Sequence, residues 1–153
     1  MEQLGLLEQI RAAEILERRG YCTCIVGDLA SVVYGSNVVV FNVHIAVADD
    51  ALRSALETLL EHGYSEEAQF GFESIGPAKD CSSGWPGYRL CGPSTKRDGV
   101  GVLLIPSSLW HLDLDGPSFL SDTFLFPGSM CRFPHLEPYL NGTIIFPSIY
   151  ANV

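Results

Sequence analysis

The segment YCTCIVGDLASVVYGSNVVVFNVHIAV, residues 21–47, decides the fold. Its first part, Tyr21–Val26, is short, β-prone and almost wholly apolar, which is typical of a strand covered on both faces. The pair Gly27-Asp28 breaks this strand, and the Asp28 side chain is a candidate N-cap for a short helix that ends at Gly35-Ser36. The β-branched run Val38–Val47 then predicts a second, longer strand.

A helix is expected on each side of this segment. The apolar residues of Gln3–Arg19 mostly keep helical spacing, and Gly20 ends that pattern. On the other side, Asp49-Asp50 opens a helix through Leu60, and Gly63 lies just past its end. The resulting order of helix, strand, helix, strand and helix indicates an α/β (α+β) fold.

The second half of the chain is less regular. Ser65–Gly99 is rich in Gly, Ser and Pro, which predicts a long loop or loose hairpin with short strand-like pieces near Phe70 and Tyr88. An apolar strand returns at Val100–Ile105. Five prolines beyond it are expected to forbid any long helix, so that the last third wraps the core as loops: Pro117, Pro127, Pro134, Pro138 and Pro147. We expect one domain over 1–153, with a core at 1–105 and a loop-rich extension at 106–153.

Composition excludes several classes of partner. Nine Lys and Arg against eighteen Asp and Glu give a net charge of -9, and no stretch collects enough basic residues to neutralise a run of phosphates. Nucleic acid is therefore not expected as a partner. Glu2, Glu8 and Glu14 interrupt the apolar N-terminus, unlike a secretory signal, and no window reaches the roughly 18 uncharged apolar residues of a membrane span. A cytoplasmic protein without membrane contact is expected.

Three features lie close together between Ile25 and Tyr64. They are the phrase Ile25–Ala30, a short helix ending at Tyr34-Gly35, and a long strand with polar Asn42 and His44 that leads to a helix ending at His62-Gly63-Tyr64. In this combination the chain resembles the nucleotidyltransferase superfamily, with a weaker continuation to Ile105. It is most similar to small fungal members without an assigned reaction, in which phrases like Leu104–Ser107 and Phe133–Leu136 also occur. The resemblance implies a mixed sheet flanked by helices.

Active members of that superfamily use positions that differ in this chain. Their Gly-Gly or Gly-Ser turn approaches a nucleotide triphosphate, whereas Gly27 is followed here by Asp28, whose carboxylate would repel phosphate. Their next strand carries two acidic residues that hold two Mg²⁺ ions, and the matching positions here are Asn42 and His44. Neither supplies the negative charge that Mg²⁺ demands. The later strand has no third carboxylate, although Asp98 lies just before it. We therefore expect no metal site and no cofactor.

Asn42 and His44 remain the main candidates for chemistry, because alternate residues of a strand face the same way. The imidazole offers a general acid or base, and the amide offers a donor and an acceptor. The alternative is a hydrogen-bonded pair left from an inactive site. Asp28 is a third catalytic candidate, unless it only caps the helix. Candidate ligand contacts are Gly27, Ser36, Asn37, Trp85, Tyr88 and Trp110, and the aromatic residues among them either line an apolar pocket or anchor loops.

Three functions are compatible with these residues. The first is a degenerate, non-catalytic member of the fold that binds an apolar small molecule or a nucleotide, or serves as an interaction module. The second is a metal-independent cyclase or isomerase of secondary metabolism that reuses the cleft. The third is a residual nucleotidyltransferase in which Asp28 or Asp98 replaces the lost ligands. An exposed apolar patch is also expected, and self-association is one way to cover it; its residues are Leu136, Leu140, Ile144, Ile145 and Phe146.

Overall fold

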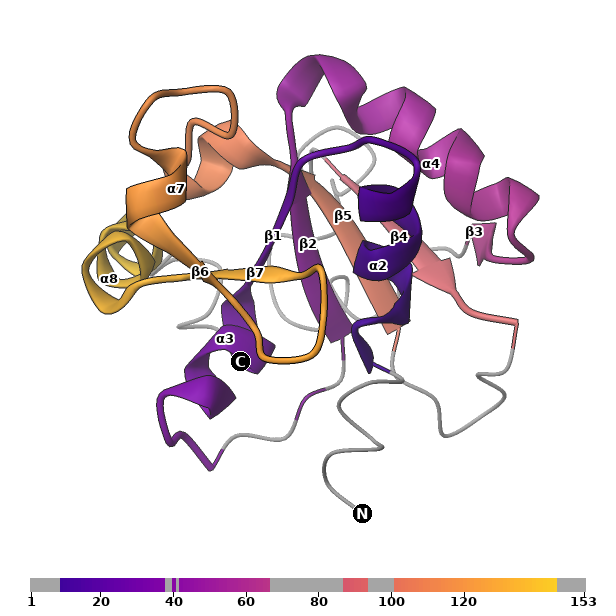
Figure 1. Ribbon diagram of the computed structural model, residues 1–153. Coiled ribbons are helices and arrows are strands. Elements are labelled where there is room, and N and C mark those ends of the chain that lie inside the picture. The colour runs from indigo at the N-terminus through magenta and orange to yellow at the C-terminus, as the bar shows by residue number, and fades with distance from the viewer. Residues whose placement is uncertain (1–8, 38–39, 41, 67–86, 94–100, 146–153) are drawn as a thin grey trace.

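The computed structural model describes residues 9–37, 40, 42–66, 87–93 and 101–145. Five strands form one mixed sheet in the order β1-β2-β5-β4-β3. Their bounds are β1 (Thr23–Val26), β2 (Asn42–Val47), β3 (Ser65–Glu66), β4 (Tyr88–Cys91) and β5 (Gly101–Pro106). Strand β2 is antiparallel to β1 and parallel to β5, whereas β4 is antiparallel to both of its neighbours. The expectation of an α/β (α+β) chain with a mixed sheet and flanking helices is confirmed (Figure 1).

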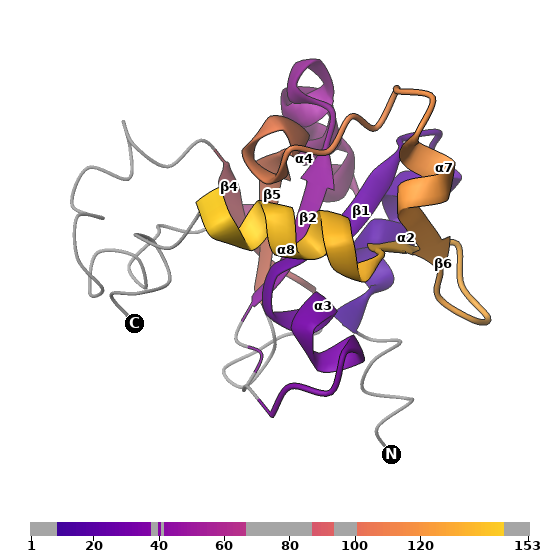
Figure 2. The same ribbon diagram turned by 90° about the vertical axis from the view of Figure 1, so that its left-hand side faces the viewer.

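Helices lie on both faces of this sheet. On one face are α2 (Arg11–Arg18) and α4 (Leu52–Glu61), and α4 follows the short helix η1 (Asp49–Ala51). On the other face are η3 (Ser107–Trp110) and α8 (Leu136–Ile145), and α8 crosses in front of the strands in Figure 2. Helix α3 (Gly27–Val33) continues directly from β1 and lies beside α8 in that view. The sheet is therefore the middle layer of three.

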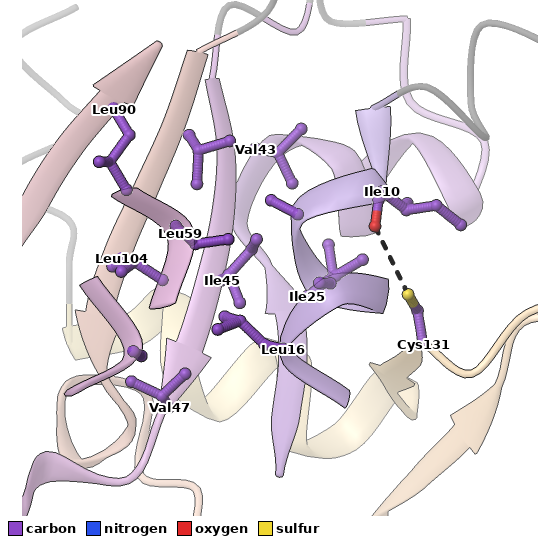
Figure 3. Close-up of a cluster of buried hydrophobic side chains, with 14 of the residues drawn as sticks. Ile10, Leu16, Ile25, Val43, Ile45, Val47, Leu59, Leu90, Leu104 and Cys131 are labelled. Atoms are coloured by element: carbon purple, nitrogen blue, oxygen red, sulfur yellow. Dashed lines mark hydrogen bonds between the residues drawn. The ribbon is translucent and has the colours of Figure 1, made fainter. Parts of the chain in front are cut away.

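The core between the sheet and the helices α2 and α4 is built from alternate strand residues. Ile25, Ile45 and Leu104 point toward these helices, where Leu16 and Leu59 meet them (Figure 3). All five side chains are buried, and burial of one such side chain contributes about 1.5–3 kcal/mol. The odd-numbered positions of β2 therefore serve the core, and its even-numbered positions face the side of α8.

The C-terminal third contributes to the same core. Helix α7 (Phe119–Asp122) leads into a two-stranded sheet of β6 (Thr123–Leu125) and β7 (Arg132–Pro134). Just before β7, the buried Cys131 donates its Sγ–H to the carbonyl oxygen of Ile10 at 3.7 Å (Figure 3). Phe133 of β7 belongs to the same buried cluster as the strands of the large sheet. Segments more than a hundred residues apart in the chain thus pack together.

Most of the predicted elements between residues 9 and 66 are present in the described part of the chain. The helix ends expected at Gly35 and Gly63 are confirmed, since these residues have φ of +94° and +92°, a conformation that glycine adopts without strain. The strands expected near Tyr88 and at Val100–Ile105 are present as β4 and β5. The strand-like piece near Phe70 lies outside the described residues.

The expectation that prolines forbid a long helix in the last third is wrong. Helix α8 has ten residues and contains Pro138. This proline is the third residue of the helix, and the first four N–H groups of a helix have no intrahelical acceptor, so its missing N–H costs no helical hydrogen bond. Beyond it, the N–H of Tyr139 donates to the carbonyl oxygen of His135 at 3.0 Å. The loop-rich extension therefore carries a helix that lies on the sheet.

Part of the predicted apolar patch is on the surface of α8. Leu136 and Leu140 are 49% and 47% exposed, one helical turn apart. The side chains of Ile144, Ile145 and Phe146 lie outside the described part of the chain. None of the described helices combines the length and the apolar character that crossing a membrane requires.

Candidate functional site

Asn42 and His44 project from the same face of β2, as their spacing predicted. His44 stands opposite Val26 of β1 and Leu103 of β5, and Asn42 stands opposite Gly101 of β5. Val26 and Leu103 belong to a second buried cluster, separate from the core that faces α2 and α4. The two polar residues therefore lie on the side of the sheet that η3 and α8 cover.

His44 is packed against the backbone of Gly27, where β1 turns into α3. Gly27 has φ of +71°, and a Cβ placed there would lie 2.5 Å from Nδ1 of His44 and 2.7 Å from its Cγ. The absent side chain of Gly27 is what makes room for the imidazole. Only 5% of His44 is exposed, and this burial lowers its pKa to about 4. The imidazole is therefore neutral at neutral pH, which is a poor state for holding an anion.

Asn42 uses a second glycine in a similar way. A Cβ on Gly101 would lie 2.5 Å from Oδ1 of Asn42, so the amide packs against the backbone of β5 at Gly101. This oxygen is buried, and no described residue donates a hydrogen bond to it. Buried amide oxygens are usually hydrogen-bonded, so this acceptor is suited to a donor group of a ligand.

The interpretation of Asp28 as a helix cap is wrong. Helix α3 begins one residue earlier than predicted, at Gly27, with Val26 as its N-cap and no hydrogen bond from a capping side chain. The positive φ of Gly27 allows the chain to turn from strand to helix at once, and this places Asp28 in the first helical turn. Asp28 is half-buried, and burial raises the pKa of its carboxyl group.

Three aromatic rings lie over this side of the sheet. Trp110, at the end of η3, is buried, and its ring stacks on Tyr139 of α8 with centroids 5.7 Å apart. Tyr139 also contacts Tyr34, at the end of α3, with centroids 6.0 Å apart. The Tyr34 hydroxyl donates to the carbonyl oxygen of Pro134 at 2.7 Å, just before α8 begins. A Cβ on Gly142 would collide with the ring of Trp110, so α8 and η3 approach closely there.

Three other predicted ligand contacts, Tyr88, Ser36 and Asn37, do not gather around His44. Tyr88 packs into the cluster that faces α2 and α4, on the opposite side of the sheet from Trp110, so the two cannot line one pocket. Ser36 and Asn37 lie beyond the C-terminal end of α3, whereas Gly27 is its first residue. The Ser36 N–H donates to the carbonyl oxygen of Ser31 and so closes the end of the helix. Trp85 lies outside the described residues.

Sequence reasoning missed Tyr34 and Tyr139. In the sequence, Tyr34 only marks the end of a short helix, and Tyr139 stands in a proline-containing stretch that predicts a loop. Their ring contact joins residues that are 105 positions apart in the chain. Only the docking of α8 on the sheet brings them together.

The described residues around Asn42 and His44 do not form a set of metal ligands. Within the described ranges, no three side chains among His, Cys, Asp and Glu are placed so that they could hold one ion. Strand β5, the best match for the third catalytic strand of the resemblance, carries no acidic residue. Asp98, the proposed substitute, lies outside the described residues. Asn42 and His44 provide neutral nitrogen and oxygen donors that suit organic ligands better than Mg²⁺.

Comparison with known proteins adds no family to these observations. No family model, no curated protein and no solved structure matches this chain.

Proposed function

We propose that this protein is a catalytically degenerate nucleotidyltransferase-fold protein that binds a small organic molecule and carries out no metal-dependent transfer. The observation that supports this most is the nature of the Asn42–His44 face. It offers an amide oxygen and a neutral imidazole, on the side of the sheet that also carries Trp110 and Tyr139, where catalysis with Mg²⁺ would need two carboxylates. Such a surface suits a largely apolar ligand that carries a few hydrogen-bonding groups.

General base catalysis by His44 is a weaker alternative. A base works best when its pKa lies near the pH at which the enzyme operates. Burial holds the pKa of His44 at about 4, which leaves the imidazole neutral but a weak proton acceptor at neutral pH. Binding therefore uses the properties of this residue better than proton transfer does.

Magnesium and ATP are expected to leave the melting temperature unchanged, with or without EDTA. A ligand present at about a hundred times its Kd stabilises the native state by about 2.7 kcal/mol. In a chain of this size that stabilisation would raise the melting temperature by roughly 5–10 °C. A rise of that size that depends on Mg²⁺ and disappears with EDTA would favour the hypothesis of a residual nucleotidyltransferase and contradict this proposal.

A small molecule that stays bound during purification is expected to depend on Asn42. Native mass spectrometry of the wild-type protein should show added mass that is clearly reduced in Asn42→Ala, since loss of one hydrogen bond to a buried group costs roughly 1–1.5 kcal/mol and so raises the Kd by about tenfold. Asn37→Ala is the matched control, because Asn37 is exposed beyond the far end of α3. Equal occupancy in both variants would place the ligand elsewhere on the protein.

A further inference from the structure

Exposed apolar side chains gather on the C-terminal third of the chain. Of the eight large apolar side chains that the described residues expose, five lie in the stretch from η3 to α8. Leu120 of α7 is 69% exposed, and Leu136 and Leu140 of α8 are about half exposed. The N–H of His135 donates to the carbonyl oxygen of Asp122 at 2.8 Å, so the start of α8 lies against the end of α7. These leucines therefore belong to adjoining elements (Figure 2).

Tyr34 extends this apolar area to the end of α3. Its side chain is 40% exposed, its hydroxyl bonds to the carbonyl oxygen of Pro134 and its ring contacts Tyr139. We call the four exposed residues the α8 surface: Tyr34, Leu120, Leu136 and Leu140. Single exposed apolar residues are ordinary on proteins, whereas several on adjoining elements mark an interaction site.

The charges around the α8 surface are almost all negative. From residue 107 to residue 145 the chain has one basic residue, Arg132, and four acidic residues, which are Asp113, Asp115, Asp122 and Glu137. The guanidinium of Arg132 is used within the protein, because it donates to Oγ1 of Thr123 at 3.2 Å and lies 5.8 Å above the ring of Phe119. Arg11 and Arg18 belong to α2, on the other face of the sheet. The α8 surface is therefore apolar with an acidic rim.

This charge distribution selects among the possible occupants. A second copy of the chain would bring the same carboxylates against this face, and phospholipid and nucleic acid surfaces are themselves anionic. Like charges that face each other across an interface oppose binding, and the whole chain carries a net charge of -9. A partner that combines apolar and basic side chains has the complementary charge, and an amphipathic helix presents both along one side.

We infer that the α8 surface docks a basic amphipathic helix of another protein. The apolar side of that helix packs on Leu120, Leu136 and Leu140, and its Lys and Arg side chains lie beside Glu137 and Asp122. This interaction goes beyond the proposed ligand binding, which concerns Asn42 and His44 on the sheet itself.

A peptide of Leu and Lys alone, helical over roughly 18 residues and apolar on one side, tests the site by fluorescence anisotropy. Replacing Leu136 and Leu140 together by serine is expected to weaken its binding by about tenfold or more, because the contact loses two buried leucines. Leu60→Ser is the matched control, since Leu60 is 40% exposed on α4, across the sheet. An unchanged affinity in the double variant, or an equal loss in Leu60→Ser, would overturn the inference.

The charge of the partner is tested with a second peptide, in which every Lys is replaced by Glu and the apolar side is kept. It is expected to bind the wild-type protein at least about tenfold more weakly than the Lys peptide. Glu137→Gln is expected to weaken binding of the Lys peptide by about two- to threefold, and Glu57→Gln on α4 is expected to leave it unchanged. Equal affinities for the two peptides would contradict a basic partner.

Hydrogen–deuterium exchange of the wild-type protein locates the peptide without any substitution. Saturating Lys peptide is expected to slow exchange of the α8 amides by about fivefold or more and to leave the α4 amides unchanged. Slowing in α4 alone would place the peptide on the wrong face. A dimer by light scattering, or binding to phosphatidylserine vesicles, that the double serine variant abolishes would assign the surface to a second copy or to a membrane and overturn the inference.

Discussion

Replacing Gly27 with alanine is expected to lower the free energy of unfolding by roughly 2–5 kcal/mol. About 1–2 kcal/mol comes from placing a side chain at a positive φ, and about 1–3 kcal/mol comes from overpacking against the imidazole of His44. The new Cβ would lie 2.5 Å from Nδ1, and both atoms are fixed, one by the backbone and one by burial. Urea unfolding followed by circular dichroism measures the loss.

Gly35→Ala provides the matched control for this change. Gly35 also has a positive φ, +94°, but nothing lies within 4 Å of the position its Cβ would take. Its substitution should therefore cost only the backbone part. In a His44→Ala background, Gly27→Ala should cost no more than Gly35→Ala does, because the clash is gone. If the cost of Gly27→Ala stayed the same in that background, the contact with His44 would not be its cause.

Acidification is expected to destabilise the protein through His44. In the unfolded chain this residue takes up a proton near its ordinary pKa of 6.5, whereas burial keeps the folded-state pKa at about 4. Between these two values the unfolded state binds more protons, so the stability is fully present above pH 6.5 and is lost as the pH falls toward 4. The loss amounts to about 3 kcal/mol, or roughly 6–12 °C in melting temperature.

Two carboxylates act in the opposite direction. Burial raises the pKa of Asp28 and of Glu17, so that on acidification the folded state takes up their protons first and gains stability. The contribution of His44 is therefore measured as the difference between the pH profiles of the wild type and His44→Asn. His111→Asn is the control, because His111 is exposed and asparagine accepts its left-handed backbone, φ 54°. Parallel profiles for wild type and His44→Asn would contradict the buried, neutral imidazole.

These two predictions concern the same contact, which joins the turn after β1 to the middle of β2. The sequence pointed to both partners, since Gly27 followed a strand and His44 alternated with Asn42. It could not show that the glycine exists to admit the imidazole. That relation depends on the antiparallel register of Val26 with His44, which sets the start of α3 directly over the ring.

The elements that local forces control can be predicted from residue pattern alone. Helical spacing, β-branched runs and the glycines at positions 35 and 63 fixed where α4, β2 and the end of α3 lie, because these signals act within a few residues. The sequence also placed an amide and an imidazole two residues apart on β2, so that both face one side of the sheet. These are properties of single residues and of the twofold repeat of a strand.

What covers that face depends on long-range packing. No local pattern predicts that α8 forms through Pro138, or that Tyr139 meets Trp110 and Tyr34, because those contacts join distant segments and depend on which side of the sheet each segment crosses. The side of the sheet on which Tyr88 lies also depends on strand register. Tyr88 of β4 stands opposite Leu104 of β5 and therefore shares the face that packs against α2 and α4. A shift of one residue turns a strand side chain to the other side of a sheet, and only packing selects between the two.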